Sequence, residues 1–257
     1  MNLFPTKTRL RLLRDVADGM VWFSPHENAV HNRATAPAHN VLSATAEQRQ
    51  AGWITVDIRD NADTLGHYPY RPTGTGWNLL AKHLPDAGPI PPVWLLDVDG
   101  VINATTPQWG CETSIGKARA AGTAYRLRWA KPLIDRIREL HTTLAVEVRW
   151  CTTWCAYADE LERLWDLPAL DRAFTDDING YAASLAKLAA ARQVLADGRR
   201  LIWTDDMEVP TAGPVSDELT DGGRSLLIRP DECYGLKPVD LDAIELFARS
   251  EAAEVTA

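Results

Sequence analysis

Short apolar runs alternate with longer amphipathic segments over the C-terminal two thirds of the chain. The runs have the length of β-strands, and the segments between them space their apolar residues as helices do. The predicted strands are 93–96, 144–150, 201–203 and 225–228, and the predicted helices are 132–140, 156–164, 182–196 and 240–249. Strands that alternate with helices indicate an α/β fold, with a parallel sheet covered on both faces. Ligands of such sheets bind at the carboxyl ends of the strands.

A proline-rich segment precedes this region. Residues 85–92 read PDAGPIPP, and this density of proline cannot continue a helix or a central strand. We therefore place a domain boundary here. It separates an N-terminal domain at 1–88 from a C-terminal domain at 93–250.

The N-terminal domain alternates helices and strands in a different order. The predicted elements are helix 6–18, an irregular segment 23–40, helix 44–51 preceded by Ser43, strand 53–58, strand 68–71 and helix 75–83. This order resembles a small α+β winged-helix domain, in which the segment EQRQAGWITV ends the recognition helix and enters the wing. The irregular segment stands where one helix of that fold is expected. The resemblance implies a domain that binds DNA or RNA, and binding of a partner protein is left open as the alternative.

Composition and charge argue against a secreted protein, a membrane protein and an indiscriminate nucleic-acid-binding protein. The chain is 46% apolar and 24% charged, and its first residues, MNLFPTKTRLRLLRDV, carry charges where a signal peptide needs an apolar run. We expect a cytoplasmic protein without membrane contact. The net charge of −8 argues against indiscriminate nucleic-acid binding by the whole chain, although residues 1–92 balance nine basic against eight acidic side chains.

The four cysteines form no CxxC pair, and we expect them to be reduced. They are Cys111, Cys151, Cys155 and Cys233. Cys151 and Cys155 are close enough in sequence to share a zinc ion, but no second Cys or His pair lies nearby to complete a tetrahedral site.

The segment VWLLDVDGVIN at 93–103 carries the main chemical signal. An apolar strand ends at Asp97, Asp99 follows two places later, and Gly100 comes next. Two acids at a strand end repel each other and are costly to desolvate, so they need a cation or hydrogen-bond donors. Mg²⁺ suits that need, because it prefers oxygen ligands and shares them with substrate phosphate. Gly100 permits a sharp turn that brings backbone amides toward an anion.

The string DVDGVIN resembles the DxDGT/V signature of the haloacid dehalogenase (HAD) superfamily of phosphatases. Further segments match the family's other motifs in the same order: VEVRWCTTW with Thr152, the helix at 182–196 with Lys187, and RLIWTDDME with Asp205 and Asp206. The match implies that Thr152 binds the transferred phosphoryl group and that Lys187 balances its charge. Arg192 lies on the same helix and is a rival for the role of Lys187.

The resemblance implies a Rossmann-like parallel sheet of the HAD type with a minimal cap, and a magnesium-dependent phosphomonoester hydrolase. Asp97 would attack phosphorus to form an aspartyl-phosphate, while Asp99 acts as general acid and then general base. The residues implied for the metal are Asp97, Asp99, Asp205 and Asp206, and those implied for substrate are Gly100, Thr153 and Trp154. For Trp154, core packing is favoured over stacking on a base.

The segment between Asp97 and Thr152 is too short for a large cap. After the predicted helix and strand are subtracted, about 25 to 30 residues remain, more than a βα loop of roughly two to six residues needs. We expect a flap or small hairpin that includes RLRW at 126–129. A minimal cap implies an open site, which suits a macromolecular substrate or a lid from another chain.

A narrower resemblance rests on LLDVDGVIN, WCTTW, IWTDDME and LLIRPDECYGLKPVDLDAIELF. These strings are similar to a compact subgroup of HAD proteins of bacteria and bacteriophages, some of them related to RNA-repair proteins. The expected partner is then a phosphorylated small molecule or a nucleic-acid end. Two alternatives stay open: a nucleic-acid-binding or regulatory protein whose HAD-like domain binds a ligand or partner, and a structural phage factor that retains only the fold. A homo-oligomer is also left open.

Overall fold

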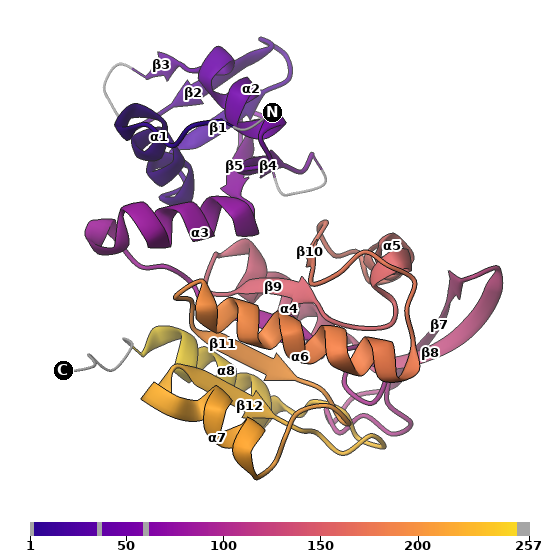
Figure 1. The fold of residues 1–257 in the computed structure, drawn as a ribbon. Helices are drawn as coiled ribbons and strands as arrows, with labels where there is room; N and C mark the ends of the chain where they lie inside the picture. The colour runs from indigo at the N-terminus through magenta and orange to yellow at the C-terminus, as the bar shows by residue number, and fades with distance from the viewer. Residues whose placement is uncertain (1–2, 35–37, 59–61, 251–257) are drawn as a thin grey trace. The chain divides into compact units, whose positions relative to one another are not determined.

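The computed structural model describes residues 3–34, 38–58 and 62–250. The chain divides into two compact units, Met1–Ile90 and Pro91–Ala257 (Figure 1). The division falls inside the segment PDAGPIPP. Within the described residues, no helix combines the length and the apolar character that crossing a membrane requires.

The first unit is an α+β structure built on an antiparallel sheet with the order β3-β2-β1-β5-β4. Its strands are β1 Val21–Ser24, β2 Ala29–Asn32, β3 His39–Asn40, β4 Ile54–Val56 and β5 Tyr68–Pro72. Its helices are α1 Lys7–Ala17, α2 Leu42–Gln50 and α3 Gly74–His83, followed by the 3-10 helix η1 Pro85–Ala87. The predicted helices and the two predicted strands are therefore present in this unit.

The prediction of an irregular segment at 23–40 is wrong for its described part; residues 35–37 lie outside the described residues. β1 and β2 form a hairpin there, in register from Val21 with Asn32 to Ser24 with Ala29. Asn28 has a φ of 47°, a left-handed conformation that asparagine tolerates better than most residues and that allows the tight reversal. The four-residue strands are too short to display a clear alternation of apolar and polar residues.

The second unit is an α/β structure whose sheet is parallel throughout, as predicted, with the order β10-β9-β6-β11-β12. Its strands are β6 Val93–Leu96, β9 Glu147–Trp150, β10 Asp171–Arg172, β11 Leu201–Thr204 and β12 Ser225–Ile228. Numbered along the chain, these strands have the order 3-2-1-4-5 across the sheet. This is the Rossmann-like order, and its direction reverses at β6, beside β11, where ligands of such sheets bind.

Helices cover both faces of this sheet (Figure 1). They are α4 Lys131–Thr142, α5 Ala158–Trp165, α6 Gly180–Ala196, α7 Pro214–Thr220 and α8 Pro238–Arg249, with the 3-10 helices η2 Cys155–Tyr157 and η3 Asp221–Gly223. Successive residues of β6 point to opposite faces. Trp94 and Leu96 pack into a core with residues of α4, α5 and α8, whereas Val93 and Leu95 pack against α6 and α7. β6 is therefore buried on both sides.

Two elements of this unit were not predicted. The two-residue strand β10 is too short to give a pattern. Helix α7 buries only Leu219, so it lacks the apolar stripe by which a helix is found in a sequence. The strand predicted at 144–150 begins only at Glu147, because Leu144 adopts a φ of 60° in the preceding turn.

A long hairpin lies between β6 and α4. Strands β7 Thr113–Ala120 and β8 Thr123–Ala130 pair antiparallel along their whole length. This confirms the prediction of a flap or small hairpin between Asp97 and Thr152.

Candidate active site

Asp97 and Asp205 lie next to each other at the carboxyl ends of two adjacent strands. The register of β6 and β11 pairs Leu96 with Thr204, and the backbone N–H of Asp97 donates to the carbonyl of Thr204 at 3.1 Å. The next residue of each strand is therefore an aspartate. Both carboxylates are buried, Asp205 completely and Asp97 with 6% of its surface exposed.

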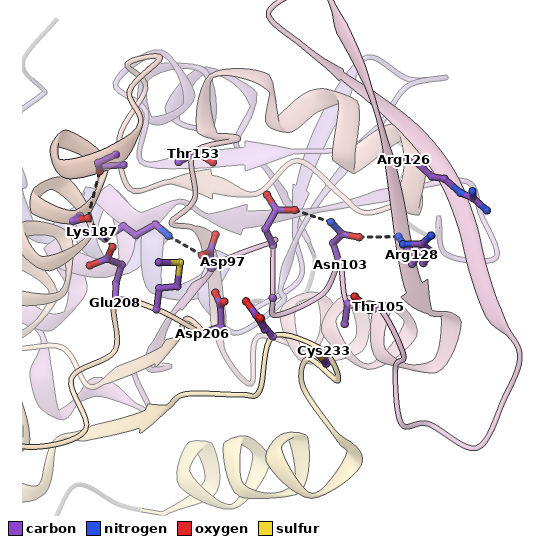
Figure 2. A pocket seen from close by; sticks show the side chains of 18 residues that line it. Asp97, Asn103, Thr105, Arg126, Arg128, Thr153, Lys187, Asp206, Glu208 and Cys233 are labelled. Carbon is purple, nitrogen blue, oxygen red and sulfur yellow. Dashed lines mark hydrogen bonds and ion pairs between the residues drawn. The ribbon is translucent and has the colours of Figure 1, made fainter.

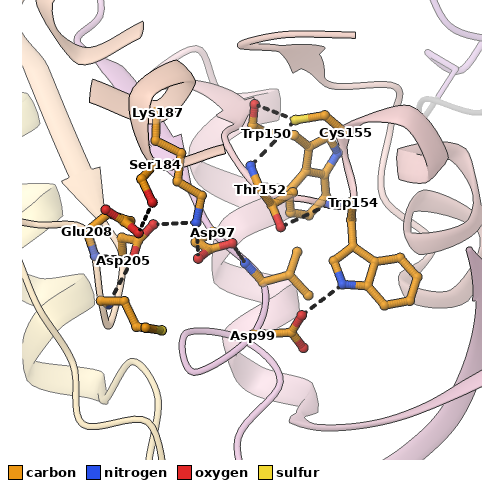
Figure 3. Close-up of polar contacts among 12 residues, drawn as sticks. Asp97, Asp99, Trp150, Thr152, Trp154, Cys155, Ser184, Lys187, Asp205 and Glu208 are labelled. Atoms are coloured by element: carbon orange, nitrogen blue, oxygen red, sulfur yellow. Dashed lines mark hydrogen bonds and ion pairs between the residues drawn. The ribbon is translucent and has the colours of Figure 1, made fainter. Parts of the chain in front are cut away.

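Lys187 of helix α6 joins these two carboxylates (Figure 3). Its Nζ donates to Oδ2 of Asp97 and to Oδ2 of Asp205, each at 2.7 Å. Burial disfavours the charged ammonium, but the two carboxylates outweigh burial and raise the pKa of Lys187 above its usual range. The rival candidate Arg192 is exposed and pairs with Glu218 at 2.6 Å, away from these aspartates. Of the two, only Lys187 contacts Asp97.

Asp206 completes a group of carboxylates that could hold a cation. One oxygen each of Asp97, Asp205 and Asp206 lies within 4.8 Å of the others. Burial, together with the charge of Asp205, raises the pKa of Asp206. Burial raises the pKa of Asp97 to about 7, and Lys187 only partly offsets this effect. Buried carboxylates with raised pKa values are stabilised by an additional cation, so this donor set fits Mg²⁺.

The two members of the acidic pair differ in how many oxygens are free. Oδ1 of Asp205 accepts the backbone N–H groups of Met207 at 2.9 Å and Glu208 at 2.7 Å, and its Oδ2 accepts Lys187. Asp206 lines the cavity described below, and no side chain among the described residues donates to it. Asp206 is therefore the member of the pair whose carboxylate is available to a ligand.

Asp99 lies outside this carboxylate group. Asn103 Nδ2 donates to Oδ1 of Asp99 at 2.7 Å, and Trp154 Nε1 donates to Oδ2 at 3.0 Å. These two donors hold the carboxylate at the cavity wall. In Figure 3 it lies apart from Asp97 and Asp205. The structure therefore does not bring the Asp99 side chain, predicted as a metal ligand, into the group of Asp97, Asp205 and Asp206. Its position suits the other expected role, proton transfer.

The side chain of Trp154 packs in the core and donates a hydrogen bond to Asp99. The side chain is buried, with 5% exposed, and does not line the cavity. Its ring meets Tyr125 edge to face with centroids 5.4 Å apart. The structure does not place Trp154, predicted to bind substrate, in the cavity wall, and its indole N–H donates to Asp99.

The two threonines after β9 also differ in position. Thr152 is fully buried, and its hydroxyl oxygen accepts the N–H of Trp154 at 3.3 Å. Its hydrogen bond to Asp97 offsets a small part of the rise that burial causes in the pKa of that carboxyl. Thr153 is exposed and lines the cavity. The buried thiol of Cys155 donates to the carbonyl of Trp150 at 3.4 Å and accepts the N–H of Thr152, so it stabilises this turn.

Gly100 provides a close approach that another residue would block. Its φ is +68°, and a Cβ there would lie 2.2 Å from Cγ of Asp206. Glycine is thus required both by backbone conformation and by the proximity of the third aspartate. Gly100 lines the cavity, and its close approach to Asp206 is a contact that the sequence pattern does not reveal.

These residues open into a cavity of about 660 Å³ (Figure 2). Its wall also includes polar residues that are not among the predicted site residues, such as Asn103, Ser184, Glu208, Arg128 and Glu232. Asn103 connects Asp99 to the hairpin, since its Oδ1 accepts the backbone N–H of Arg128 at 2.8 Å. The alternation in RLRW indicates that Arg126 and Arg128 share a strand face, but it does not indicate that this face borders the cavity.

Comparison of the chain with protein-family models, with curated proteins and with solved structures gives no match.

Proposed function

We propose that the second unit is a magnesium-dependent phosphomonoester hydrolase of the HAD type, with Asp97 as the nucleophile. The observation that carries this proposal is the arrangement of Asp97, which lies at the switch point of the sheet, between Lys187 and Asp206. Burial of a carboxylate costs free energy, and a buried carboxylate in a cleft is therefore a candidate for a chemical role. Here the carboxylate also lines a cavity, where a substrate can reach it.

Asp97 and Asp206 would hold Mg²⁺, with Asp205 and Lys187 fixing their positions. Asp205 uses both its oxygens to anchor the loop and Lys187, so we assign it a positioning role. Bound there, Mg²⁺ would supply positive charge to the phosphoryl oxygens.

Asp97 would attack phosphorus with one carboxylate oxygen. A phosphorus–oxygen bond to Asp97 forms as the bond to the leaving alcohol breaks, and protonated Asp99 gives its proton to the leaving oxygen. Water then attacks the aspartyl-phosphate, Asp99 takes a proton from it, and Asp97 is released with inorganic phosphate. The ammonium of Lys187, 2.7 Å from Asp97, offsets negative charge that gathers on the phosphoryl group.

The contacts of Asp99 support its role as acid and base. Asn103 and Trp154 hold the carboxylate in one orientation at the cavity wall, which a proton donor to a bound leaving group requires. Thr153 and the backbone at Gly100 line the same cavity and would bind phosphoryl oxygens.

The test is hydrolysis of p-nitrophenyl phosphate by the full chain with and without Mg²⁺. We expect turnover that needs Mg²⁺ and is lost in Asp97→Asn, while Asp135→Asn, at an exposed surface ion pair with Lys131, keeps the wild-type rate. Wild-type turnover by Asp97→Asn would overturn the assignment of the nucleophile. No turnover of any phosphomonoester with Mg²⁺ present would overturn the activity itself.

A second candidate function is nucleic-acid binding by the first unit, as a winged-helix-like domain. It is favoured by Arg49 and Gln50, which are exposed at the C-terminal end of helix α2. They precede strand β4 in the order expected of a recognition helix and wing. In that case Arg49→Ala in the full chain weakens retardation of duplex DNA in a gel, and Asp97→Asn does not. DNA retardation that is equal in wild type and Arg49→Ala would exclude this role of α2.

A further inference from the structure

The β7–β8 hairpin carries four basic side chains on one face. Register pairs Lys117 with Arg126, Ile115 with Arg128, and Arg119 with Ala124. Cross-strand partners lie on the same face of an antiparallel pair, and so do residues two apart along a strand. Lys117, Arg119, Arg126 and Arg128 therefore share one side of the hairpin, which we call the basic face.

The opposite side of the hairpin packs onto the unit's core. Ala118 and Leu127 are each only 1% exposed and belong to the core cluster of the sheet. Gly116 leaves room for Leu164 of helix α5, since a Cβ there would lie 2.6 Å from Leu164 Cδ1. Burial of this side holds the hairpin against the unit and leaves the basic face free of core contacts.

The basic face has no internal countercharge. Lys117, Arg119 and Arg126 are exposed and Arg128 is half-buried. In the part of the chain that the structure describes, none of the four forms an ion pair with an acidic side chain. Residues 93–257 have a net charge of −9, so these unpaired cations are a local departure from an acidic unit. Such a stripe attracts a polyanion.

The basic face leads into the candidate active site. Arg126 and Arg128 line the same cavity as Asp97, Asp99 and Asp206 (Figure 2). Lys117 and Arg119 do not line it; Arg119 pairs with Ala124 close to the hairpin turn. A ligand that contacts all four must enter the cavity and also extend along the hairpin.

We propose that the basic face binds the phosphodiester backbone of a single nucleic-acid strand whose terminal phosphate enters the cavity. This inference rests on the proposed phosphatase activity and names its substrate class. The cavity of about 660 Å³ has the size of a site for one small ligand, so a single terminal nucleotide fits it. A small phosphate ester would use the cavity alone and would leave Lys117 and Arg119 without a role.

Binding can be measured without turnover. The probe is a fluorescein-labelled 12-nucleotide strand with a terminal phosphate, in 3′- and 5′-phosphorylated versions, added to the wild-type chain in EDTA. Four phosphate contacts predict a slope of about −2.8 for log K against log[salt] on a single strand, or roughly fiftyfold weaker binding at 200 mM than at 50 mM salt. A slope near zero for both strands would overturn the inference.

Lys117 and Arg119, the two residues of the basic face outside the cavity, give the decisive variant. Lys117→Gln combined with Arg119→Gln should bring the slope to about −1.4, because two contacts remain. The matched control is Lys131→Gln combined with Arg163→Gln, which removes the same charge from exposed side chains of the same unit that pair with acidic neighbours. Equal salt slopes for the two double variants would assign the binding to overall charge and overturn the role of the basic face.

Turnover separates this inference from the proposed activity. We expect Lys117→Gln/Arg119→Gln to lower kcat/KM at least fivefold for the phosphorylated strand and to leave hydrolysis of p-nitrophenyl phosphate unchanged. If the wild-type chain hydrolyses p-nitrophenyl phosphate but has equal kcat/KM for a mononucleotide and a 12-nucleotide strand, the activity stands and the strand-binding inference fails. Competition by inorganic polyphosphate as strong as by the oligonucleotide would also overturn the assignment to nucleic acid.

Discussion

The ammonium nitrogen of Lys187 lies 2.7 Å from Oδ2 of Asp97, and both side chains are buried in the second unit. The same nitrogen lies 2.7 Å from Asp205, so one cation is shared by two carboxylates. Helix α6 thereby supplies the charge that permits two aspartates to stand side by side at the ends of β6 and β11. Stability and the proposed chemistry therefore both depend on the contacts of Lys187 with these two carboxylates.

Replacement of Lys187 by Gln should therefore destabilise the protein as well as inactivate it. Removing one partner of a buried ion pair costs about 3–5 kcal/mol, because it leaves uncompensated charge. We expect this loss in urea unfolding without Mg²⁺, partial recovery when Mg²⁺ is added, and a fall in kcat of about 10²–10³-fold. Arg192→Gln, on the same helix but in an exposed ion pair, should change neither quantity. Equal stability of Lys187→Gln and wild type would refute the importance of the shared cation.

A Trp154→Phe substitution tests whether the indole N–H orients Asp99. An aromatic ring stays in place, while the indole N–H and its 3.0 Å hydrogen bond to Oδ2 of Asp99 are lost. A hydrogen bond to a charged group contributes about 1.5–3 kcal/mol, so kcat for an aryl phosphate should fall by roughly one to two orders of magnitude.

The matched control for that variant is Trp165→Phe. Trp165 is also buried, with 3% exposed, but its Nε1 has no hydrogen-bond partner among the described residues. Both variants remove the same atoms from the same core cluster. If kcat falls equally in the two, packing and not orientation of Asp99 explains the effect.

These contacts mark the limit of what sequence patterns can predict. The position of Asp97 follows from an apolar run that ends in an acid, and the length of the segment before Thr152 predicts the hairpin. The hydrogen bond of Trp154 to Asp99 joins side chains 55 residues apart, and it depends on side-chain directions that no periodicity encodes. The same holds for the hydrogen bond of Asn103 to Asp99, because the motif DVDGVIN does not indicate the direction of the Asn103 side chain.

Strand order explains another part of the difference between the sequence predictions and the structure. The adjacency of Asp97 and Asp205 requires β6 to pair with β11, which lies far along the chain, and only the motif order suggested it. In the first unit, the hairpin of β1 and β2 was missed because neither four-residue strand alternates clearly. Short elements are specified by their pairing partners more than by their own residues.

The buried ion cluster around Glu147 predicts how stability depends on pH. Oε2 of Glu147 accepts Nη2 of Arg199 at 2.8 Å, and Arg149 forms a second ion pair with the same carboxylate. Burial alone would raise the pKa of Glu147, but the charges of Arg199 and Arg149 outweigh it and lower the pKa below its ordinary value of 4.5. The folded state therefore binds fewer protons at Glu147 than the unfolded state does.

It follows that the contribution of Glu147 is complete above pH 4.5 and is lost as the pH falls through the lowered pKa of the folded state. Glu147→Gln should be less stable than wild type by about 3–5 kcal/mol at pH 7, and this difference should shrink below pH 4.5. Urea unfolding across this range measures it. Glu218→Gln, in an exposed pair, serves as the control. A difference that stays constant down to pH 2 would contradict the role of the cluster.

Gly100→Ala should separate metal binding from folding. A Cβ at Gly100 would lie 2.2 Å from Cγ of Asp206, so the substitution must displace the carboxylate that we assign to Mg²⁺. Gly122→Ala in the hairpin turn is the matched control, because its φ of +79° imposes similar strain while nothing lies within 4 Å of the added carbon. A ligand that binds only the folded state raises the melting temperature, so Mg²⁺ should stabilise wild type and Gly122→Ala but not Gly100→Ala. An equal Mg²⁺-dependent shift in all three proteins would show that the ion binds elsewhere, because only one of the two alanines intrudes on Asp206.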